Sequence, residues 1–164
     1  MTNREFEKFI YQQKEKMFRF AISILQNSEN AEDAVQEVVL KLWKNKRSLN
    51  TSRNPESYCM RTLKNNCLDE LRKQNIRINY QSNLQVDLFR EPEVENLDLV
   101  EKIRQELVKL PTQQRMAIEL KDFLGYNYEE ISEILELNVN AIRVNVSRGR
   151  KKLHEIFKEE LKDA

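Results

Sequence analysis

Apolar side chains recur every three or four residues along most of this 164-residue chain, as they do on the buried face of an α-helix. In the N-terminal half the repeat predicts helices over residues 4–26, 31–43 and 55–73. The buried stripe of the second helix is predicted to include Trp43. Residues 44–54 are polar and basic without periodicity, which indicates a loop.

Helical periodicity is lost over residues 75–97, which gather polar side chains and a proline and are predicted to be a linker. The helical pattern returns over residues 97–110. A further helix is predicted to begin at Thr112, its N-terminal cap. The sequence therefore predicts an all-α protein with two small helical domains, residues 1–74 and 98–164, joined by a flexible linker.

Two helical patterns separated by a tight connection lie near the C-terminal end. The first covers residues 128–135 and has Asn127 in position to cap it, and the second follows Asn138, which is also a good cap. This spacing is typical of a helix-turn-helix, whose second helix enters the major groove of DNA. Glu136 stands in the turn where glycine is usual, so either a positive φ at this residue or a different turn geometry is expected.

The second of these helices is expected to have one buried stripe and one polar arc. The stripe consists of Ile142, Val146, Gly149 and Leu153. The polar arc consists of Asn140, Arg143, Val144, Ser147, Arg148 and Lys151. Asn and Arg can pair bidentately with base edges, whereas Arg150 and the lysines after it suit phosphates. The arc is therefore predicted to bind duplex DNA, although an amphipathic helix with a solvated basic face is the simpler alternative.

Composition narrows the classes of function. The chain has only two glycines and three prolines, the residues that commonly form the turns between β-strands. This composition favours a helical protein. The net charge is only +1, but residues 143–152 hold five basic side chains and no acidic one, so charge is placed locally. No apolar run is long enough to cross a membrane and the N-terminus lacks a signal-peptide core. We therefore expect a cytoplasmic protein with no membrane insertion of its own.

Candidate chemistry is scarce in this chain. Cys59 and Cys67 lie two turns apart on one predicted helix and cannot bridge each other, so reduced, partly buried thiols are expected. With His154 they do not make a zinc site, and no metal or cofactor is expected. The chain also has no glycine-rich phosphate loop, and we predict that it is not an enzyme.

Three segments together resemble one protein family, and they occur in that family's order. They are AEDAVQEVVLKLW (31–43), NPESYCMRTLKNNCLDELRK (54–73), with Asn65 and Asp69 at matching positions, and residues 111–153. They are similar to the polymerase-docking helix, the promoter-melting helix and the upstream-element domain of extracytoplasmic-function (ECF) sigma factors of the sigma-70 family. The resemblance implies a sigma factor that binds core RNA polymerase, recognises the −10 and −35 promoter elements and promotes DNA opening.

The resemblance also implies roles for particular residues. The residues expected to bind polymerase are Asp33, Gln36, Glu37 and Lys41. They form a polar helix face that suits a basic or polar protein partner, although an ordinary solvated helix face would have the same composition. In the family this part of the chain holds an extruded base of the −10 element. The residues expected to contact the −10 element and to assist DNA melting are Lys44, Lys46, Arg47, Arg53, Tyr58, Arg61, Lys64 and Asn65. Tyr58 replaces a common Trp, and packing in the core is expected for it. The polar arc is expected to bind the −35 element. An anti-sigma factor is expected as a regulator.

Three other interpretations of the sequence remain open. A conventional helix-turn-helix repressor or activator predicts stable binding to a palindrome without polymerase. An enzyme lacks the residues described above. An adaptor built only of interaction helices leaves the basic arc unexplained.

Overall fold

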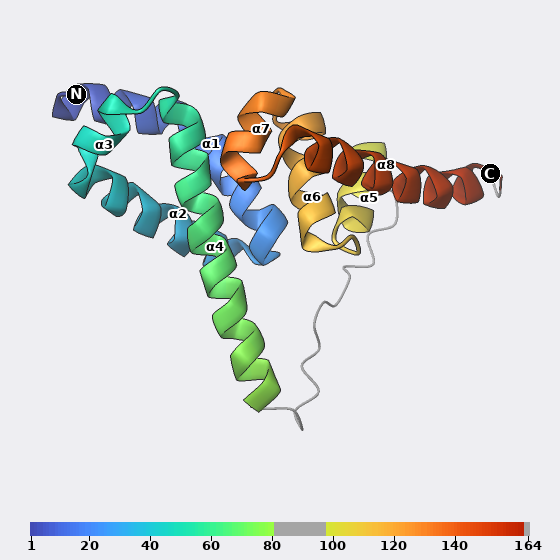
Figure 1. Cartoon of the computed structure of the whole chain (residues 1–164). Coiled ribbons are helices and arrows are strands. Elements are labelled where there is room, and N and C mark those ends of the chain that lie inside the picture. Colours follow the sequence, from blue (N-terminus) through green and yellow to red (C-terminus); the bar gives the residue numbers. More distant parts are fainter. Residues whose placement is uncertain (81–97, 163–164) are drawn as a thin grey trace.

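The computed structural model describes residues 1–80 and 98–162, and every regular element within these ranges is a helix, which confirms the all-α prediction (Figure 1). Residues 81–97, most of the predicted linker, lie outside the described ranges. The elements are α1 (Asn3–Leu25), α2 (Ser28–Lys44), α3 (Lys46–Thr51), α4 (Pro55–Tyr80), α5 (Leu99–Leu107), α6 (Thr112–Ile118), the π-helix η1 (Glu119–Phe123), α7 (Tyr128–Leu135) and α8 (Val139–Lys162).

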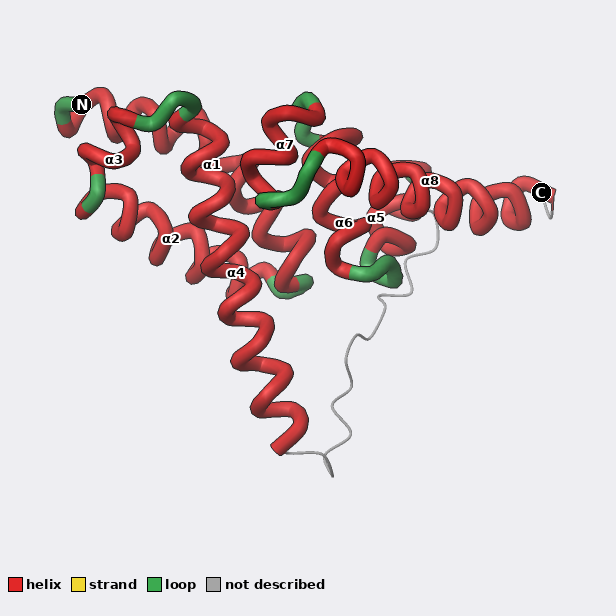
Figure 2. Tube along the Cα trace, viewed as in Figure 1, coloured by secondary structure: helices red, strands yellow, loops and turns green. Residues whose placement is uncertain are grey.

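The helices form two groups. Helices α1, α2 and α4 pack on one another with α3 beside them, and α6, η1 and α7 pack with α8 (Figure 1). The connections between consecutive helices within each group are short (Figure 2). The C-terminal parts of α4 and α8 project from the body in different directions (Figure 1).

Two predicted boundaries in the N-terminal half are wrong. The predicted loop over residues 44–54 contains α3, whose single buried side chain, Leu49, is too little to produce a periodic pattern. Helix α4 does not end near residue 73 but continues to Tyr80. Its last turns carry no apolar stripe because they project from the body, and Ile76 there is 56% exposed.

Two local expectations also fail, at Thr112 and at Trp43. Thr112 does not cap α6: it is the first residue of that helix, and Pro111 occupies the cap position. Helical structure after Ile118 continues as the π-helix η1, which the apolar pattern does not distinguish from an α-helix. Trp43 is 37% exposed instead of buried, with its ring edge-on to Phe6 and its face under the ammonium of Lys46.

The two groups of helices share one hydrophobic core. Buried side chains of α1 and α4 form a single cluster with those of α6, η1 and α7. They include Met17, Phe20, Met60, Leu63, Met116, Leu120, Ile131 and Ile134. The sequence predicts two helical domains joined by a linker, and the structure adds that the two groups of helices also pack directly on each other across this core.

Arg115 fixes the position of α6 against the end of α1. It is 6% exposed, and burial lowers the pKa of its guanidinium. Its Nη1 donates to the carbonyl of Leu110 at 2.9 Å, while Nε and Nη2 donate to the carbonyls of Ser23 and Ile24. The carbonyls of Ser23 and Ile24 are available because α1 ends at Leu25 and leaves its last carbonyls without helical partners.

Gly149 allows α8 to lie against α6. A Cβ atom at this position would stand 2.2 Å from Cδ1 of the fully buried Ile118. In an open helix, replacing glycine with alanine stabilises by about 1 kcal/mol. Here overpacking of about 1–3 kcal/mol outweighs that gain, so Gly149→Ala lowers the free energy of unfolding.

The double-mutant cycle with Ile118→Val tests this contact, because valine lacks the clashing Cδ1 atom. We expect Gly149→Ala to be better tolerated in the Ile118→Val background, with a favourable coupling of about 1–3 kcal/mol in urea unfolding. Strictly additive effects of the two substitutions would contradict the proposed contact.

Candidate nucleic-acid interface

The helix-turn-helix forms as predicted. Helix α7 covers the predicted residues 128–135, and the Asn127 side chain accepts a hydrogen bond from the Glu130 N–H at 2.8 Å. Asn138 accepts in the same way from the N–H of Ala141 at 2.8 Å. Both predicted caps are confirmed, and they fix where each helix of the motif begins.

The turn between α7 and α8 contains a left-handed residue. Glu136 has φ 56° and ψ 41°, a conformation that costs a non-glycine residue about 1 kcal/mol or more. The hydroxyl of Ser132 donates to the carbonyl of Leu137 and ties α7 to this turn.

The polar arc of α8 is exposed and its opposite stripe is buried. Each of the six predicted arc residues, Asn140, Arg143, Val144, Ser147, Arg148 and Lys151, lies on the surface. Ile142, Val146 and Leu153 point into the protein, as predicted. The guanidinium of Arg143 lies 5.0 Å from the ring centroid of Tyr128, and Lys121 lies 4.6 Å from the same centroid. The arc thus meets solvent with one of its arginines held against an aromatic ring.

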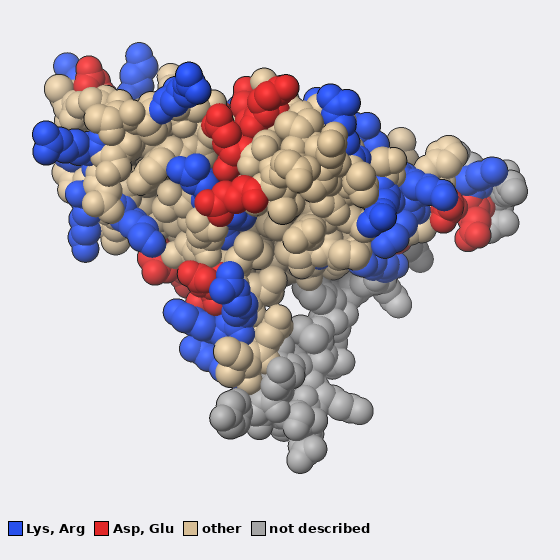
Figure 3. All heavy atoms as spheres, in the orientation of Figure 1, with Lys and Arg blue, Asp and Glu red and all other residues tan. Residues whose placement is uncertain are grey.

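Arg150, which was expected to bind phosphate, forms an ion pair within the protein. Its guanidinium makes two bonds to the Asp122 carboxylate, with Nε 3.0 Å from Oδ2, and this pairing raises the pKa of Arg150. The pair connects α8 to η1. Lys151 and Lys152 remain exposed beside the arc, and basic side chains gather on this side of α8 in Figure 3.

The polar face of α2 is exposed as well. Asp33, Gln36, Glu37 and Lys41 all lie on the surface. Leu40 lies between them in the sequence and is 61% exposed, which sequence reasoning missed. A large apolar side chain among acidic ones fits a protein partner better than it fits water.

The residues predicted to contact the −10 element spread over α2, α3 and α4. Lys44, Arg47, Arg53 and Asn65 are exposed. Lys46 is half-buried, with its ammonium 3.7 Å from the Trp43 ring centroid. Tyr58 is also half-buried, and the guanidinium of Arg61 lies 5.5 Å from its ring centroid.

A recess between α2 and α4 brings part of this set together. It holds about 210 Å³ and is called the α2–α4 recess below. Its lining residues are Lys41, Leu42, Asn45, Tyr58, Thr62 and Asn65. Tyr58 therefore both packs and faces a cavity. The helical spacing of Tyr58, Thr62 and Asn65 was the sequence signal for one wall, but nothing in the sequence pointed to Asn45.

Lys64 does not join the other predicted −10 residues on the surface. Its side chain is only 6% exposed, and its ammonium lies 2.9 Å from a carboxylate oxygen of Glu136 in the helix-turn-helix. This hydrogen bond, together with the positive charge, lowers the pKa of Glu136. Sequence periodicity could not reveal the burial, because the covering side chain comes from the other group of helices.

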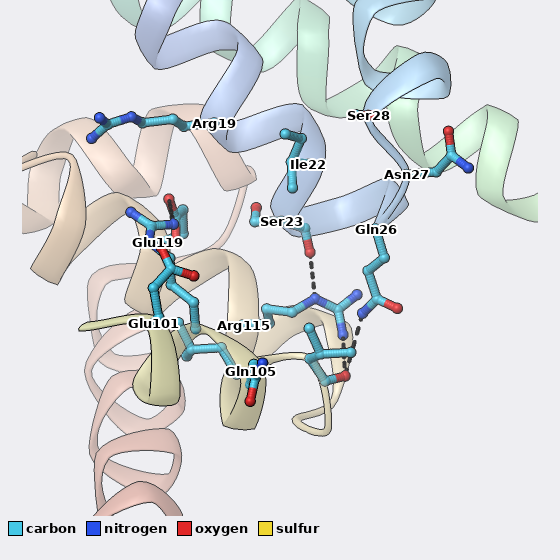
Figure 4. A pocket seen from close by; sticks show the side chains of 13 residues that line it. Arg19, Ile22, Ser23, Gln26, Asn27, Ser28, Glu101, Gln105, Arg115 and Glu119 are labelled. Carbon is cyan, nitrogen blue, oxygen red and sulfur yellow. Dashed lines mark hydrogen bonds and ion pairs between the residues drawn. The ribbon is translucent and has the colours of Figure 1, made fainter. Parts of the chain in front are cut away.

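A second cavity lies where the two groups of helices meet, between the end of α1 and helices α5 and α6. It holds about 390 Å³, and Figure 4 shows Arg115 reaching across it to the end of α1. Glu119 on its wall is 1% exposed, and burial raises the pKa of this carboxyl group. Arg104 opposes that shift from 3.4 Å. Neither Arg115 nor Glu119 was expected to be buried.

The two cysteines are free thiols in the core. Cys59 and Cys67 are fully buried, more than predicted, and burial raises the pKa of each thiol to about 12. Within the described ranges, no group of three or more His, Cys, Asp or Glu side chains is placed to hold a metal ion. None of the described helices combines the length and apolar character needed to cross a bilayer.

Both groups of helices match families of known proteins. The family Sigma-70 region 2 matches residues 10–76, and Sigma-70 region 4 matches residues 100–153. The chain is 31% identical to the RNA polymerase sigma factor SigV of Bacillus subtilis over 90% of its length and 89% of the relative's. The chain belongs to the sigma-70 family. It is also 30% identical to the ECF sigma factor EcfG of Rhodopseudomonas palustris, over 82% of the chain and 75% of that protein.

Solved structures of sigma factors have the same fold. The sigma factor RpoE of Bartonella quintana, in complex with the anti-sigma factor NepR, superimposes with a TM-score of 0.80 at 25% identity. That match covers 94% of this chain and 98% of the other. CnrH, in complex with the cytosolic domain of CnrY, matches with a TM-score of 0.70 at 19% identity and supports the fold alone.

The protein is thus an ECF sigma factor with a role in transcription initiation. Helices α1–α4 correspond to region 2, and helices α5–α8 correspond to region 4. The direct packing of the two groups is therefore a contact between region 2 and region 4, and Lys64 and Glu136 lie on opposite sides of it.

Proposed function

We propose that this sigma factor binds core RNA polymerase through α2, reads the −35 element with α8 and holds melted −10 DNA at the α2–α4 recess. The observation that carries the proposal is the exposure of the complete polar arc on a correctly capped helix-turn-helix. We assign residues 1–74 to core-polymerase binding and to the −10 element, residues 98–164 to the −35 element, and residues 75–97 to a linker. The protein acts by binding, in the cytoplasm where polymerase and promoter meet, and polymerase performs the chemistry.

The face of α2 supplies the polymerase contact in this proposal. Asp33, Gln36, Glu37 and Lys41 surround Leu40, so acidic groups lie around an apolar centre. Protein interfaces commonly have this arrangement, in which the apolar centre contributes affinity and the charged rim orients the partner.

Reversing Asp33 and Glu37 to Lys tests this assignment. We expect the double variant to lose promoter-specific transcription in vitro with purified core polymerase, and to lose core binding in pull-down. Its helical circular dichroism should stay unchanged, because both side chains are exposed. Glu155→Lys with Glu159→Lys is the matched control for charge. Normal core binding by the α2 variant, or tight binding of the wild-type protein to a palindrome without polymerase, would refute the assignment.

The polar arc of α8 supplies the −35 contact. Arg143 and Arg148 are exposed and suit the acceptor pairs of guanine in the major groove, whereas Lys151 suits a phosphate. The buried stripe of α8 packs on α6 and α7, and this packing determines which side of α8 can enter the groove.

Arg148→Ala distinguishes base reading from phosphate contact. If Arg148 pairs with a base edge, its loss should cost about 1–3 kcal/mol of binding to promoter DNA and remove discrimination at one base pair. Lys151→Ala should instead weaken binding to all sequences and reduce its salt dependence. Holoenzyme binding to a promoter library measures both effects, and equal loss on every sequence would exclude base reading by Arg148.

The α2–α4 recess supplies the −10 contact. It is open to solvent, and a tyrosine ring and two amide side chains, Asn45 and Asn65, line it. An aromatic face stacks on any base, and amides form hydrogen bonds with the edge of an extruded one. Lys44, Arg47 and Arg53 are exposed on the same part of region 2, where they suit the phosphates of a melted strand.

Asn65→Ala is expected to slow promoter opening roughly fivefold, the factor that corresponds to one lost hydrogen bond of about 1 kcal/mol. Permanganate reactivity of unpaired thymines measures the opening. Asn75→Ala on the same helix is the control, because Asn75 is exposed and lies outside the recess. Equal rates for the two variants would argue against base capture at Asn65.

An anti-sigma factor is the further partner that we propose. The RpoE and CnrH structures are complexes with NepR and with the cytosolic domain of CnrY, and RpoE resembles this chain over nearly its whole length. A regulator of this kind competes with polymerase for the surfaces of regions 2 and 4.

A further inference from the structure

Two cationic side chains of region 4 lie over the ring of Tyr128. The guanidinium of Arg143 is 5.0 Å from the ring centroid, and the ammonium of Lys121 is 4.6 Å from the same point. Both distances fall within the roughly 6 Å over which a cation is attracted to the face of an aromatic ring. The ring therefore connects η1, which carries Lys121, with the polar arc of α8.

The protein holds the Tyr128 ring in place. Tyr128 is the first residue of α7, and the Asn127 cap fixes where that helix begins. Its half-buried side chain packs against the buried side chains of the core. Arg143, by contrast, is exposed, and a long side chain in solvent samples many rotamers. A fixed aromatic face thus lies beside a side chain that would otherwise be poorly ordered.

The ring has no anionic competitor for Arg143 within the described part of the chain. Arg143 forms no ion pair there, and the carboxylate of Asp122 is paired with Arg150 instead. Arg148, further along the same arc, has neither an ion pair nor an aromatic contact among the described residues. The two exposed arginines of the arc therefore differ, because only Arg143 lies over an aromatic ring.

A guanidinium that lies on an aromatic ring can still read a base. Its flat face binds the ring, while its N–H donors lie in its own plane and point outward from its edge. Two of these donors match the O6 and N7 acceptors of guanine in the major groove. Contact with Tyr128 and pairing with a base therefore use different parts of Arg143 and are compatible.

We propose that Tyr128 is a positioning residue for −35 recognition, whose ring holds Arg143 in the conformation that pairs with a guanine. The inference rests on the proposed −35 role of the polar arc. A cation–π contact at an exposed site favours the contacting conformer by about twofold to fivefold. Apparent affinity follows the population of the conformer that can bind, so the ring should strengthen binding to the correct base pair by up to this factor. DNA with another base at that position gains nothing, and the ring therefore contributes specificity.

Binding of holoenzyme to a promoter library tests the proposal. Arg143→Ala first identifies the base pair that Arg143 reads. Tyr128→Leu removes the ring but keeps an apolar side chain, and it should lower discrimination at that base pair by about twofold to fivefold. Discrimination at the base pair read by Arg148 should stay unchanged. Because discrimination is a ratio of two affinities measured on one protein sample, partial unfolding of the variant cancels from it.

Tyr128→Phe and Phe123→Leu are the matched controls, and both should keep full discrimination. Tyr128→Phe retains the ring and loses only the hydroxyl. Phe123 is another half-buried ring of region 4, and the guanidinium of Arg104 lies 4.4 Å from its centroid. Phe123→Leu thus removes a comparable contact outside the polar arc. A loss in Tyr128→Phe equal to that in Tyr128→Leu would assign the effect to the hydroxyl, and an equal loss in Phe123→Leu would assign it to general loosening of region 4. Either result would overturn positioning by the ring.

The double variant Tyr128→Leu with Arg143→Ala shows whether the effect passes through Arg143. In the Arg143→Ala background, Tyr128→Leu should change nothing further at this base pair. A further loss there would overturn the proposal. Tighter promoter binding by the single Tyr128→Leu variant would also overturn it, because the ring would then be withholding the arginine from DNA.

Two outcomes separate this inference from the proposed function. Unchanged discrimination in Tyr128→Leu, or a uniform loss on every sequence in Arg143→Ala while Arg148→Ala relaxes one base pair, would overturn the role of Tyr128 alone. Uniform losses in both arginine variants would overturn it together with base reading by the polar arc.

Discussion

The apolar contact of α6 and α7 with α1 and α4 determines how every other surface of the protein is presented. Met116, Leu120 and Ile131 are buried in the same cluster as Met17 and Leu63, and each such side chain contributes about 1.5–3 kcal/mol when it leaves water. This contact places the turn of the helix-turn-helix against α4 and leaves the polar arc of α8 in solvent. It also leaves the α2 face uncovered, so region 4 hides only part of the proposed binding surface.

Polar groups at the edge of this contact give it one orientation. Apolar surfaces attract without a strong preference for register, whereas buried donors and charges must each find a partner. Arg115 donates to carbonyls at the end of α1, Tyr126 donates to Glu56, and Lys64 pairs with Glu136 only when region 4 sits in this position. The same groups become solvated when the regions separate, so they specify the packed arrangement more than they stabilise it.

The sequence predicted features that depend on residues nearby in the chain. It did not predict features that depend on contacts with residues far away in the chain. The caps Asn127 and Asn138 and the buried stripe of α8 depend on neighbours a few residues away, and all were predicted. The left-handed conformation of Glu136 was one of two possibilities that the sequence left open. The burial of Lys64, the clamp made by Arg115 and the pairing of Arg150 with Asp122 depend on residues far away in sequence. Short α3 and the projecting end of α4 were missed because hydrophobic periodicity detects packing, not helicity.

The burial of the two cysteines has a consequence for how oxidants act on this protein. A thiol whose pKa is about 12 remains protonated at neutral pH, and the thiol is far less reactive toward oxidants than the thiolate. Cys59 and Cys67 are also enclosed by the core of region 2. Oxidants should therefore leave Cys59 and Cys67 unmodified as long as the sigma factor is folded, so neither thiol can act as a redox switch in the native state.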